Sequence, residues 1–437
     1  MNRRDFVKSG ALLSSSIILP FHFTGADTKI KIAIVGTGWW GTDVLLPGLL
    51  TTENFEVIGL CDVDSVALQN AASKVVESGN KKPELFSDYR EMYKLPGLQA
   101  LVISTPTHWH PLQFIDACKA GLHVFLEKPI CYDIREGQAM LEAQRKANNV
   151  VQVDFPRVMT DTNNQVKSFI QTGEAGKIIQ AHANINSNEG ALVEKHIPET
   201  IDFNQFCGPA PLNRYMCSAN GTKPVWRGQH DFSRGILMDW GIHYIHNIRK
   251  IMDLDLPDYT SAIGGITGNI AVENPNFLEV QFNFGGLPVN WSHKTWGFTA
   301  TNPDHNIGIT LFGEKGTIFS GDLGWEFYPK GGKGKIAHGD VRFRPGAAEN
   351  IDIYSKMFVD LFNEFAEGIR NNSNKGITNT LQDAFNTTST VIYGDLSYLV
   401  KSGLNIDKST MNISNNDKAQ SMLKRDHRSP YQHPYMT

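Results

Sequence analysis

The sequence Lys29–Gly41 reads Lys-Ile-Lys-Ile-Ala-Ile-Val-Gly-Thr-Gly-Trp-Trp-Gly. Its apolar run, Ile30–Val35, predicts a buried strand of a parallel sheet. The run is followed by Gly36, Gly38 and Gly41, which fit the spacing G-x-G-x-x-G. In that pattern the first glycine makes a tight turn, the second lets a pyrophosphate approach the backbone, and the third lets a helix pack on the strand. A glycine triplet alone also fits a plain tight turn, so its context matters.

An acidic residue follows where a dinucleotide site needs one. A second apolar run, Phe55–Cys61, predicts the next strand and ends in Asp62, 21 residues beyond Gly41. A carboxylate at this distance accepts hydrogen bonds from the ribose hydroxyls of a dinucleotide. It also repels a 2′-phosphate, and the next residues, Val63–Ser65, include no arginine that would bind one. The sequence therefore predicts a dinucleotide site that prefers NAD to NADP.

The composition is that of an ordinary globular protein. The chain has 437 residues, which is room for about two to three domains. Hydrophobic residues make up 41% of the chain, charged residues 20%, and the formal net charge is −4. This charge gives no basic field for nucleic acid. No apolar run reaches the roughly 18 residues that a membrane-spanning helix needs, so we expect neither a nucleic-acid partner nor a membrane span.

The first residues have the features of an export signal. The paired arginines Arg3 and Arg4 precede Phe6, and a modest apolar region follows over Ala11–Phe23. This pattern predicts a twin-arginine signal over residues 1–26 and therefore a periplasmic or otherwise exported protein. Because this route exports folded proteins, a cofactor would be loaded before export. The alternative is a disordered basic tail on a cytoplasmic enzyme.

Two domains are expected after the signal. From 29 to 153, strands alternate with helices, which predicts an NAD-binding Rossmann domain with a doubly wound parallel sheet. From 154 to 437, period-two strands and long helices predict an α+β domain with a large, mostly antiparallel open sheet, followed by C-terminal helices and a tail. Ligands of doubly wound sheets bind beyond the C-terminal ends of the strands. The motifs expected at those ends are Gly36–Gly41, Asp62, Thr105–His110 and Glu127–Pro129.

The five cysteines show neither a C-x-x-C pair nor a zinc-type spacing, so we expect no metal site. Cys61 and Cys118 fall in a predicted strand and a predicted helix, where we expect them to be packing residues. Cys207 and Cys217 could bridge a loop in an oxidising compartment, but we expect both to be free.

Two groups of polar residues could carry chemistry opposite a nicotinamide. Asp239 and His243 are four residues apart, so on a helix they share one face. An imidazole beside a carboxylate can take a hydroxyl proton as hydride leaves carbon, and the carboxylate fixes its tautomer. Lys128, between Glu127 and Pro129, could stabilise a developing alkoxide. By spacing alone, a surface Asp–His pair and a solvated loop lysine are the commoner interpretations.

These motifs, taken in order, give the chain a resemblance to the Gfo/Idh/MocA family, which includes glucose–fructose oxidoreductase and inositol dehydrogenase. The resemblance extends over roughly residues 29–404 and includes Phe312–Thr317 and the C-terminal helical pair. It implies His243 as the general base, Asp239 as the residue that orients it, and Lys128 as a proton relay or electrostatic stabiliser. The cofactor-binding residues that it implies are Gly36, Thr37, Gly38, Trp39, Trp40, Gly41, Asp62, Thr105, Pro106, His110, Glu127 and Lys128.

The chain departs from the family pattern in two places. Thr107 stands where the family often has Asn or Asp, and the run Asp154–Arg157 replaces a glycine followed by paired basic residues. The segment 197–228 resembles an insertion in secreted, carbohydrate-linked members, whose aromatic and basic residues could bind a sugar or could pack in a dimer. The substrate-binding residues that we expect are Arg157, Trp226, Arg227 and His243.

The resemblance implies an NAD-dependent oxidoreductase that acts on a secondary hydroxyl of a sugar, cyclitol or glycoside. Export implies that the nicotinamide cofactor is retained, because no soluble NAD pool exists outside the cytoplasm to reoxidise it. Coupled sugar oxidoreduction and redox-neutral glycoside cleavage through a keto-sugar both recycle a retained cofactor, and Glu127–Pro129 favours the first. A non-catalytic sugar-binding protein is a third interpretation, against which Lys128, Asp239 and His243 argue. By analogy with relatives, we expect a homodimer or homotetramer.

Overall fold

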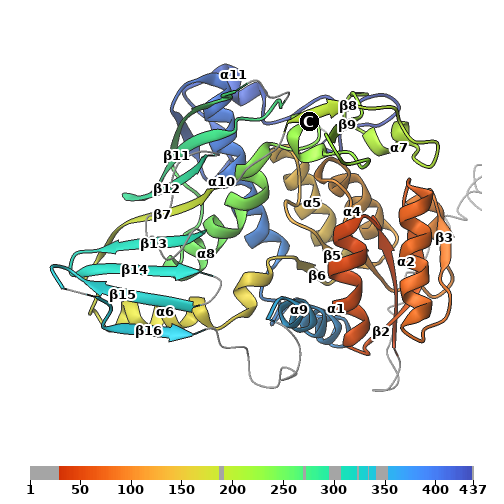
Figure 1. Cartoon of the computed structure of the whole chain (residues 1–437), viewed down its shortest axis with the longest axis horizontal. Helices are drawn as coiled ribbons and strands as arrows, with labels where there is room; N and C mark the ends of the chain where they lie inside the picture. The colour runs from red at the N-terminus through yellow and green to blue at the C-terminus, as the bar shows by residue number, and fades with distance from the viewer. Residues whose placement is uncertain are drawn as a thin grey trace, which may run out of the picture.

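The computed structural model describes residues 29–186, 191–268, 272–294, 307–321, 324–332, 334–340 and 353–435. The predicted signal, residues 1–26, lies outside this part of the chain. The described residues form two large sheets with helices packed against each (Figure 1). A parallel sheet built from the N-terminal half is followed by a larger, mostly antiparallel sheet, which confirms the predicted fold class.

The N-terminal sheet has the strand order β3-β2-β1-β4-β5-β6, and every neighbouring pair is parallel. Its strands are almost wholly apolar and buried because helices cover both faces. The chain reverses its direction of winding at β1, so a crevice opens at the C-terminal ends of β1 and β4. The strands are β1 (Ile30–Val35), β2 (Phe55–Cys61), β3 (Glu84–Phe86), β4 (Ala100–Ile103), β5 (His123–Leu126) and β6 (Val151–Val153).

The connecting helices begin at residues that satisfy their free N–H groups. Asp64 accepts hydrogen bonds from Val66 N and Ala67 N at the start of α2, and Asp133 and Glu136 form a capping box at the start of α5. After β1 the chain enters a π-helical turn, η1, before α1. The helical segments here are η1 (Trp40–Leu45), α1 (Leu46–Thr51), α2 (Ser65–Glu77), α3 (Tyr89–Met92), η2 (Thr107–Trp109), α4 (His110–Lys119), α5 (Ile134–Ala147) and η3 (Pro156–Met159).

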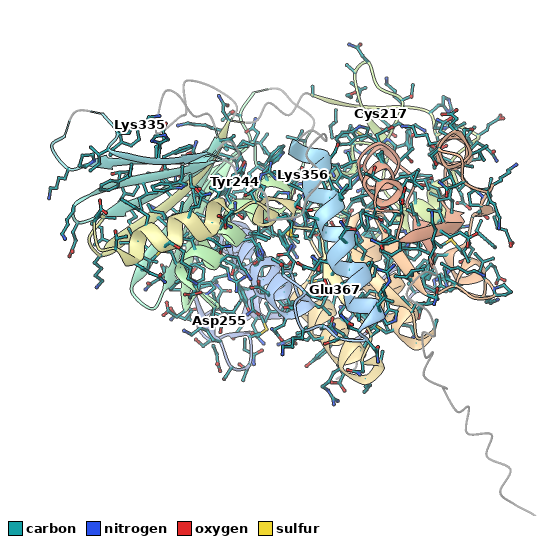
Figure 2. All side chains as sticks on the ribbon, turned by 90° about the horizontal axis from the view of Figure 1, so that it is seen from below. Cys217, Tyr244, Asp255, Lys335, Lys356 and Glu367 are labelled. Atoms are coloured by element: carbon teal, nitrogen blue, oxygen red, sulfur yellow. The ribbon has the colours of Figure 1, made fainter. Side chains whose placement is uncertain are left out.

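Helix α9 (Ile353–Arg370) comes from the far end of the sequence but completes the core of the N-terminal half. Its Phe362 ring stacks on Phe125 of β5 with 4.4 Å between ring centroids, and Phe365 stacks on Phe55 of β2. Figure 1 shows α9 beside α1, and in Figure 2 the helix that carries the labelled Lys356 and Glu367 runs between the two halves of the molecule. The two halves therefore share a core rather than touching only through a linker.

The second sheet has the strand order β16-β15-β14-β13-β7-β12-β11-β10-β17-β18. Neighbouring strands are antiparallel except β7 and β12, which are parallel. Helices α6, α8 and α10 pack against this sheet, and its core includes Trp291, Phe282 and Tyr393. Its elements are α6 (Thr162–Gln171), β7 (Ile178–Asn186), η5 (Leu237–Gly241), α8 (Ile242–Met252), β10 (Tyr259–Gly265), β11 (Phe277–Phe284), β12 (Leu287–Lys294), β13 (Ile307–Gly313), β14 (Gly316–Gly321), β15 (Gly324–Pro329), β16 (Ala337–Asp340), α10 (Leu381–Val400), β17 (Leu404–Asp407), β18 (Asn412–Ile413) and α11 (Asp417–Ser421).

A small substructure lies between α6–β7 and α8 in the sequence. It contains β8 (Leu192–Glu194), α7 (Phe203–Cys207), β9 (Met216–Ser218) and η4 (Trp226–Gly228), and Figure 1 places it next to the end of the chain. All five cysteines are buried and free, so Cys207 and Cys217 are not bridged. Within the described residues, the structure contains no helix with the length and apolar character needed to cross a membrane.

Candidate active site

A single large cavity joins the glycine turn after β1 to the second half of the molecule. Its volume is about 1310 Å³, which exceeds the roughly 300–1,000 Å³ of most pockets for one small ligand. It therefore has room for a dinucleotide and a second small molecule. Of the residues predicted for the site, those that line the cavity are Gly36, Thr37, Gly38, Trp39, Trp40, Asp62, Thr105, Pro106, Glu127, Lys128, Arg157, Trp226, Arg227, Asp239 and His243.

The glycine turn fits a dinucleotide pyrophosphate. Gly36 has φ +91°, and a Cβ there would lie 2.7 Å from the backbone of Ser104 and Thr105, so only glycine fits. A Cβ on Gly41 would lie 2.2 Å from the carbonyl oxygen of Gly36, which makes Gly41 a packing residue behind the turn. A Cβ on Gly38 would meet no protein atom within 4 Å. The backbone at Gly38 is thus open to the cavity, as close approach of a phosphate requires.

Asp62 lies directly after β2, where hydrogen bonds from nearby residues hold its side chain. One carboxylate oxygen accepts hydrogen bonds from Thr37 N at 2.6 Å and Thr37 Oγ1 at 3.2 Å, and the other accepts from Asp64 N at 2.8 Å. Burial raises the pKa of Asp62, although these hydrogen bonds oppose the rise. The carboxylate is held beside the glycine turn in the position that the ribose of a dinucleotide requires.

Two basic side chains that the sequence did not connect with Asp62 line the same end of the cavity. Lys223 forms an ion pair with Asp64, and the Arg90 guanidinium lies 3.3 Å from Asp88 and above the ring of Tyr89. Both cations are engaged by carboxylates. Lys223 is 159 residues from Asp64 in the sequence, so no local motif could place it there.

At the other end of the cavity, Lys128 follows β5 and reaches across to η5. Its Nζ donates to the Asp239 carboxylate oxygen Oδ1 at 3.0 Å and to the Asp239 carbonyl oxygen at 2.9 Å. Arg227 forms a second ion pair with Oδ1 of Asp239, at 3.1 Å from Nε. Burial alone would raise the pKa of Asp239, but Arg227 and Lys128 hold it below its ordinary value. Asp239 is therefore ionised and held by one cation from each half of the molecule.

His243 lies near this ion pair but does not take part in it. The structure gives Asp239 no hydrogen bond to His243, although both side chains are described. The Asp239 carboxylate is instead directed to Lys128 and Arg227, which lie on other parts of the chain. The side-chain contact that the i,i+4 spacing predicts is therefore not made. The expected orientation of His243 by Asp239 is not seen in this geometry.

The His243 ring is nearly buried, with 7% of its surface exposed. It packs edge-on against Phe155 and Trp240, and its Nδ1 has no hydrogen-bond partner. Burial lowers the pKa of His243 well below the ordinary value, and the nearby cations Lys128 and Arg157 lower it further. A neutral imidazole in a cavity wall can accept a proton from a bound hydroxyl.

A buried carboxyl pair lies under the same loop. Glu127 and Asp154 follow the paired residues Leu126 and Val153, and their side chains are 5% and 0% exposed. Glu127 accepts hydrogen bonds from the indole N–H of Trp40 and from Lys128 N. Burial and the adjacent Asp154 raise the pKa of Glu127 well above its ordinary value, and burial raises that of Asp154. Two such groups cannot both ionise easily, so we expect one of the two carboxyls to stay protonated at neutral pH.

Replacing Asp154 with asparagine is expected to make the stability of the protein less dependent on pH. The raised pKa values mean that the folded state binds more protons than the unfolded state above about pH 4, so wild-type stability falls as pH rises toward the folded pKa. The Asp154→Asn substitution removes one of the two titrating groups and the charge that Glu127 meets, so the free energy of unfolding should fall less with rising pH in the variant than in wild type. Urea unfolding of both proteins at about pH 5 and about pH 8 measures the two falls. The same fall in variant and wild type would contradict the raised pKa of the pair.

Three further residues predicted for the site, His110, Trp39 and Arg157, have surroundings that differ from one another. His110 is fully buried and does not line the cavity, because its Nδ1 and Nε2 each lie 2.7 Å from a backbone carbonyl, of Pro129 and Thr105 respectively. It joins the loop after β4 to the loop that carries Lys128. Trp39 is 67% exposed at the mouth of the glycine turn. Arg157 lies 5.6 Å above the ring of Trp240, a cavity-lining residue that the sequence analysis did not single out although it lies between Asp239 and His243.

Two family models match the chain. One, described as an oxidoreductase family with an NAD-binding Rossmann fold, matches residues 30–155, and its companion, described as the C-terminal alpha/beta domain of an oxidoreductase family, matches residues 162–262. Together they span more than half of the chain.

Curated relatives match shorter regions. A glycosyl hydrolase family 109 protein of Stenotrophomonas maltophilia is 31% identical over 134 residues, which are 29% of this chain and 29% of the relative. Inositol 2-dehydrogenase of Salmonella typhimurium is 27% identical over 173 residues, 39% of this chain and 50% of the relative. The chain thus spans half or less of the length of either relative.

The fold recurs in solved structures. The crystal structure of the WlbA dehydrogenase from Bordetella pertussis in complex with NADH and UDP-GlcNAcA matches with a TM-score of 0.64 and 17% identity, and the match covers 88% of this chain and 99% of that one. At this identity the likeness is evidence for the fold alone. It extends over both sheets of the described structure.

Proposed function

Because this chain belongs to the Gfo/Idh/MocA family of oxidoreductases, we propose that it oxidises a secondary hydroxyl of a sugar, cyclitol or glycoside with a retained NAD. The observation that carries the proposal is the continuity of one cavity. Gly38 and Asp62 line one end of it, and Lys128, Asp239 and His243 line the other. Gly38 and Asp62 would hold a dinucleotide at one end, and the cavity would leave space for a substrate beside Lys128 at the other.

The residues at the second end have complementary roles in the proposed reaction. A nicotinamide bound there would supply the hydride acceptor. His243 is neutral and lines this end of the cavity, so its ring can take the hydroxyl proton of the substrate. Lys128 presents an ammonium group that stabilises the oxygen as it loses that proton. Asp239 holds the ammonium group in place through its carboxylate and its carbonyl oxygen.

The covered dinucleotide end of the cavity supports retention of the cofactor. Residues of the small β8–β9 substructure, Ile201, Phe206, Lys223 and Pro224, line the cavity together with Asp62. A cofactor beneath them would exchange slowly and would be recycled in place. We propose that the protein is exported with its cofactor bound, in line with the twin-arginine pattern at residues 1–26, and that it assembles as a homodimer or homotetramer. Cell fractionation and light scattering test these two points.

A second candidate is redox-neutral cleavage of a glycosidic bond. It is favoured by the similarity over 134 residues to a glycosyl hydrolase family 109 protein. In this reaction a ring hydroxyl is oxidised, the neighbouring C–H becomes acidic, the glycosidic substituent leaves, and the hydride returns to the carbonyl carbon. The same three residues, Lys128, Asp239 and His243, would serve both reactions, since both begin with oxidation of a hydroxyl.

A panel assay is expected to separate the two candidates. Protein purified without added nucleotide is mixed with free sugars, cyclitols and aryl glycosides, and the absorbance of reduced nicotinamide and of released phenol is recorded. Coupled oxidoreduction predicts an absorbance of reduced nicotinamide that a second, oxidised sugar bleaches. Redox-neutral cleavage predicts released phenol with little accumulated reduced cofactor. Neither signal with any member of a broad panel would contradict both functions.

A further inference from the structure

Residues 197–228, here called the cleft strap, run across the mouth of the dinucleotide end of the cavity. Two backbone hydrogen bonds join the strap to the loop after β2: Ser65 N donates to Thr200 O at 2.9 Å, and Asp202 N donates to Val63 O at 3.0 Å. This loop is the one that begins with Asp62. The strap is therefore fastened directly over the position predicted for the ribose.

Side chains fasten the strap on both sides of the cleft. Lys223 of the strap forms its ion pair with Asp64 on the β2 side. On the β4 side, Trp109 Nε1 lies 3.0 Å from Gln205 O, and His108 Nε2 lies 2.8 Å from Phe206 O. The strap thus bridges the two strand ends between which the glycine turn lies.

The C-terminal tail holds the strap from outside. The Arg428 guanidinium donates to Gly208 O at 3.0 Å, to Asn204 Oδ1 at 2.6 Å and to Asn204 O at 2.8 Å. Arg428 N also donates to Pro209 O at 2.8 Å. These bonds involve four acceptors on the strap and one residue of the tail. Loss of Arg428 would therefore loosen the strap without touching the cavity.

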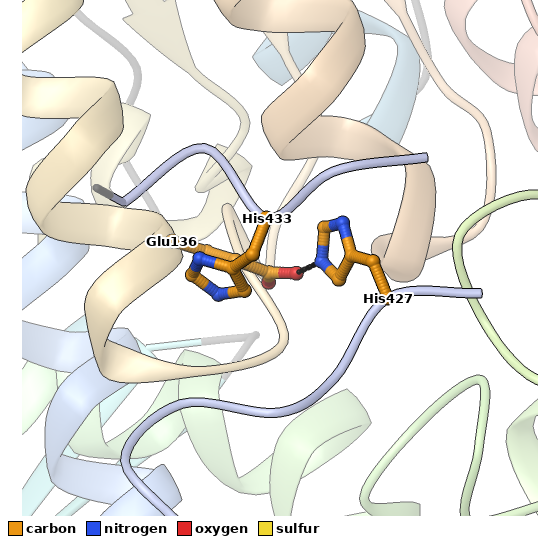
Figure 3. A group of neighbouring side chains, drawn as sticks. All are labelled: Glu136, His427 and His433. Carbon is orange, nitrogen blue, oxygen red and sulfur yellow. Dashed lines mark hydrogen bonds and ion pairs between the residues drawn. The ribbon is translucent and has the colours of Figure 1, made fainter. Parts of the chain in front are cut away.

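The tail itself is anchored on the start of α5 by the cluster in Figure 3. His427 Nε2 lies 2.9 Å from Glu136 Oε1, and Arg425 Nη2 lies 3.2 Å from the same oxygen. His433 Nδ1 accepts a hydrogen bond from Tyr435 N, so its neutral ring carries the proton on Nε2, which faces an oxygen of Asp133 at 3.1 Å. Arg425 already balances the charge of Glu136. Because His433 Nε2 carries the proton, this nitrogen has no lone pair with which to bind a metal cation. We interpret the cluster as a hydrogen-bonded anchor.

The far end of the strap enters the substrate side of the cavity at Arg227. Its backbone carbonyl accepts a hydrogen bond from Asn274 Nδ2 at 2.9 Å, and its guanidinium lies 4.4 Å above the ring of Trp226. The side chain is thereby aimed at Asp239, which it meets at 3.1 Å. Asp239 is shared between Arg227 of the strap and Lys128 of the N-terminal half.

We propose that Arg227 is a positioning residue that completes the Lys128–Asp239 pair only when the cleft strap is closed over the dinucleotide. This inference rests on the proposed function and adds to it a coupling between cofactor enclosure and assembly of the active site. Closure brings a second cation, Arg227, to Asp239. The carboxylate therefore stays ionised and keeps the orientation in which it holds Lys128 Nζ. With the strap lifted, Asp239 would retain one cation and could turn away from its position beside the substrate.

The test begins with Arg227→Ala and Arg227→Lys in the purified holoenzyme, assayed on a substrate found in the panel. A positioning role predicts that Arg227→Ala lowers kcat by about 10- to 100-fold, while KM changes by less than about threefold. Arg227→Lys should recover part of the loss because it restores the positive charge. Arg214→Ala is the matched control, since Arg214 lies in the same strap but is exposed and does not line the cavity. It should resemble wild type.

The coupling is tested with Arg428→Ala, which removes the three side-chain hydrogen bonds from the tail to the strap, leaves the backbone bond to Pro209 O, and touches neither Asp239 nor the cavity. We expect faster release of nicotinamide dinucleotide in dialysis, by about 5- to 10-fold, together with a lower kcat at saturating NAD. Faster release with an unchanged kcat, or unchanged release, would overturn the coupling. So would an Arg227→Ala variant that raises KM alone or that equals wild type. Wild-type protein that binds no nicotinamide dinucleotide would instead reject the proposed function itself.

Discussion

Replacing Lys128 with Ala is expected to lower kcat/KM by about 1,000-fold, because a preorganised donor to a developing oxyanion and a proton-transfer group each contribute roughly 10²–10⁴-fold. In the structure the ammonium group is nearly buried, with 9% of the side chain exposed, and both of its contacts are to Asp239. Its loss would remove one of the cations that line the substrate end of the cavity. It would also leave the half-buried Asp239 carboxylate with Arg227 as its partner.

The measurement compares initial rates of the Lys128→Ala variant and wild type on the same sugar or glycoside. Lys94→Ala is the matched control, because Lys94 is exposed, pairs with Glu91 on the surface and does not line the cavity. Lys128→Arg keeps the charge but not the compact ammonium geometry, so it should stay well below wild type. A Lys128→Ala variant with more than a tenth of the wild-type kcat/KM would remove Lys128 from the proposed chemistry.

Replacing His243 with Ala is expected to lower kcat by about 10²- to 10⁴-fold, the usual contribution of a general base. Because burial and the cations Lys128 and Arg157 hold the pKa of His243 well below 6.5, the wild-type ring stays neutral in weakly acidic solution. The acid limb of the wild-type kcat/KM profile should therefore lie clearly below pH 6.5, and activity should rise with pH to a plateau before that value.

The pH profile and the variant test the same residue independently. His196→Ala is the control, since His196 is exposed and does not line the cavity. An acid limb near the pKa of a free imidazole would show that His243 is not held neutral by its surroundings. A His243→Ala variant with the wild-type kcat would assign the proton transfer to another group.

Local sequence patterns predicted the N-terminal half well. The run Ile30–Val35, the glycine turn and Asp62 form a unit whose parts are fixed by neighbours in the sequence, so strand, turn and acid all lie where the spacing predicts. Lys128 also lies where its position in the sequence predicts, because it follows the end of β5 and lines the cavity. Period-two alternation also predicted the mostly antiparallel second sheet.

Two features depend on contacts between distant residues and could not be predicted from local patterns. Helix α9 completes the core under β5 because Phe362 and Phe365 find apolar partners more than 200 residues earlier. The contacts of Asp239 with Arg227 and Lys128 arise from the strap and from the packing of the two halves.

The Asp239–His243 spacing illustrates a different limit. Residues four apart share a face on a helix, but a shared face does not decide which partner a side chain takes, and the Asp239 carboxylate contacts Lys128 and Arg227 instead of His243. His110 likewise ends the segment Thr105–His110 expected to bind cofactor, yet its ring contacts two backbone carbonyl oxygens and does not line the cavity. In both cases the residues lie in the predicted region, but the side chains make other contacts.

We propose that the cavity between Gly38 and Lys128 retains a nicotinamide dinucleotide. The most direct test is to purify the protein without added nucleotide, denature it, and identify and quantify the released small molecules by mass spectrometry. We expect close to one nicotinamide dinucleotide per chain, and we expect it to be NAD rather than NADP. Active protein that releases no nicotinamide dinucleotide would contradict it.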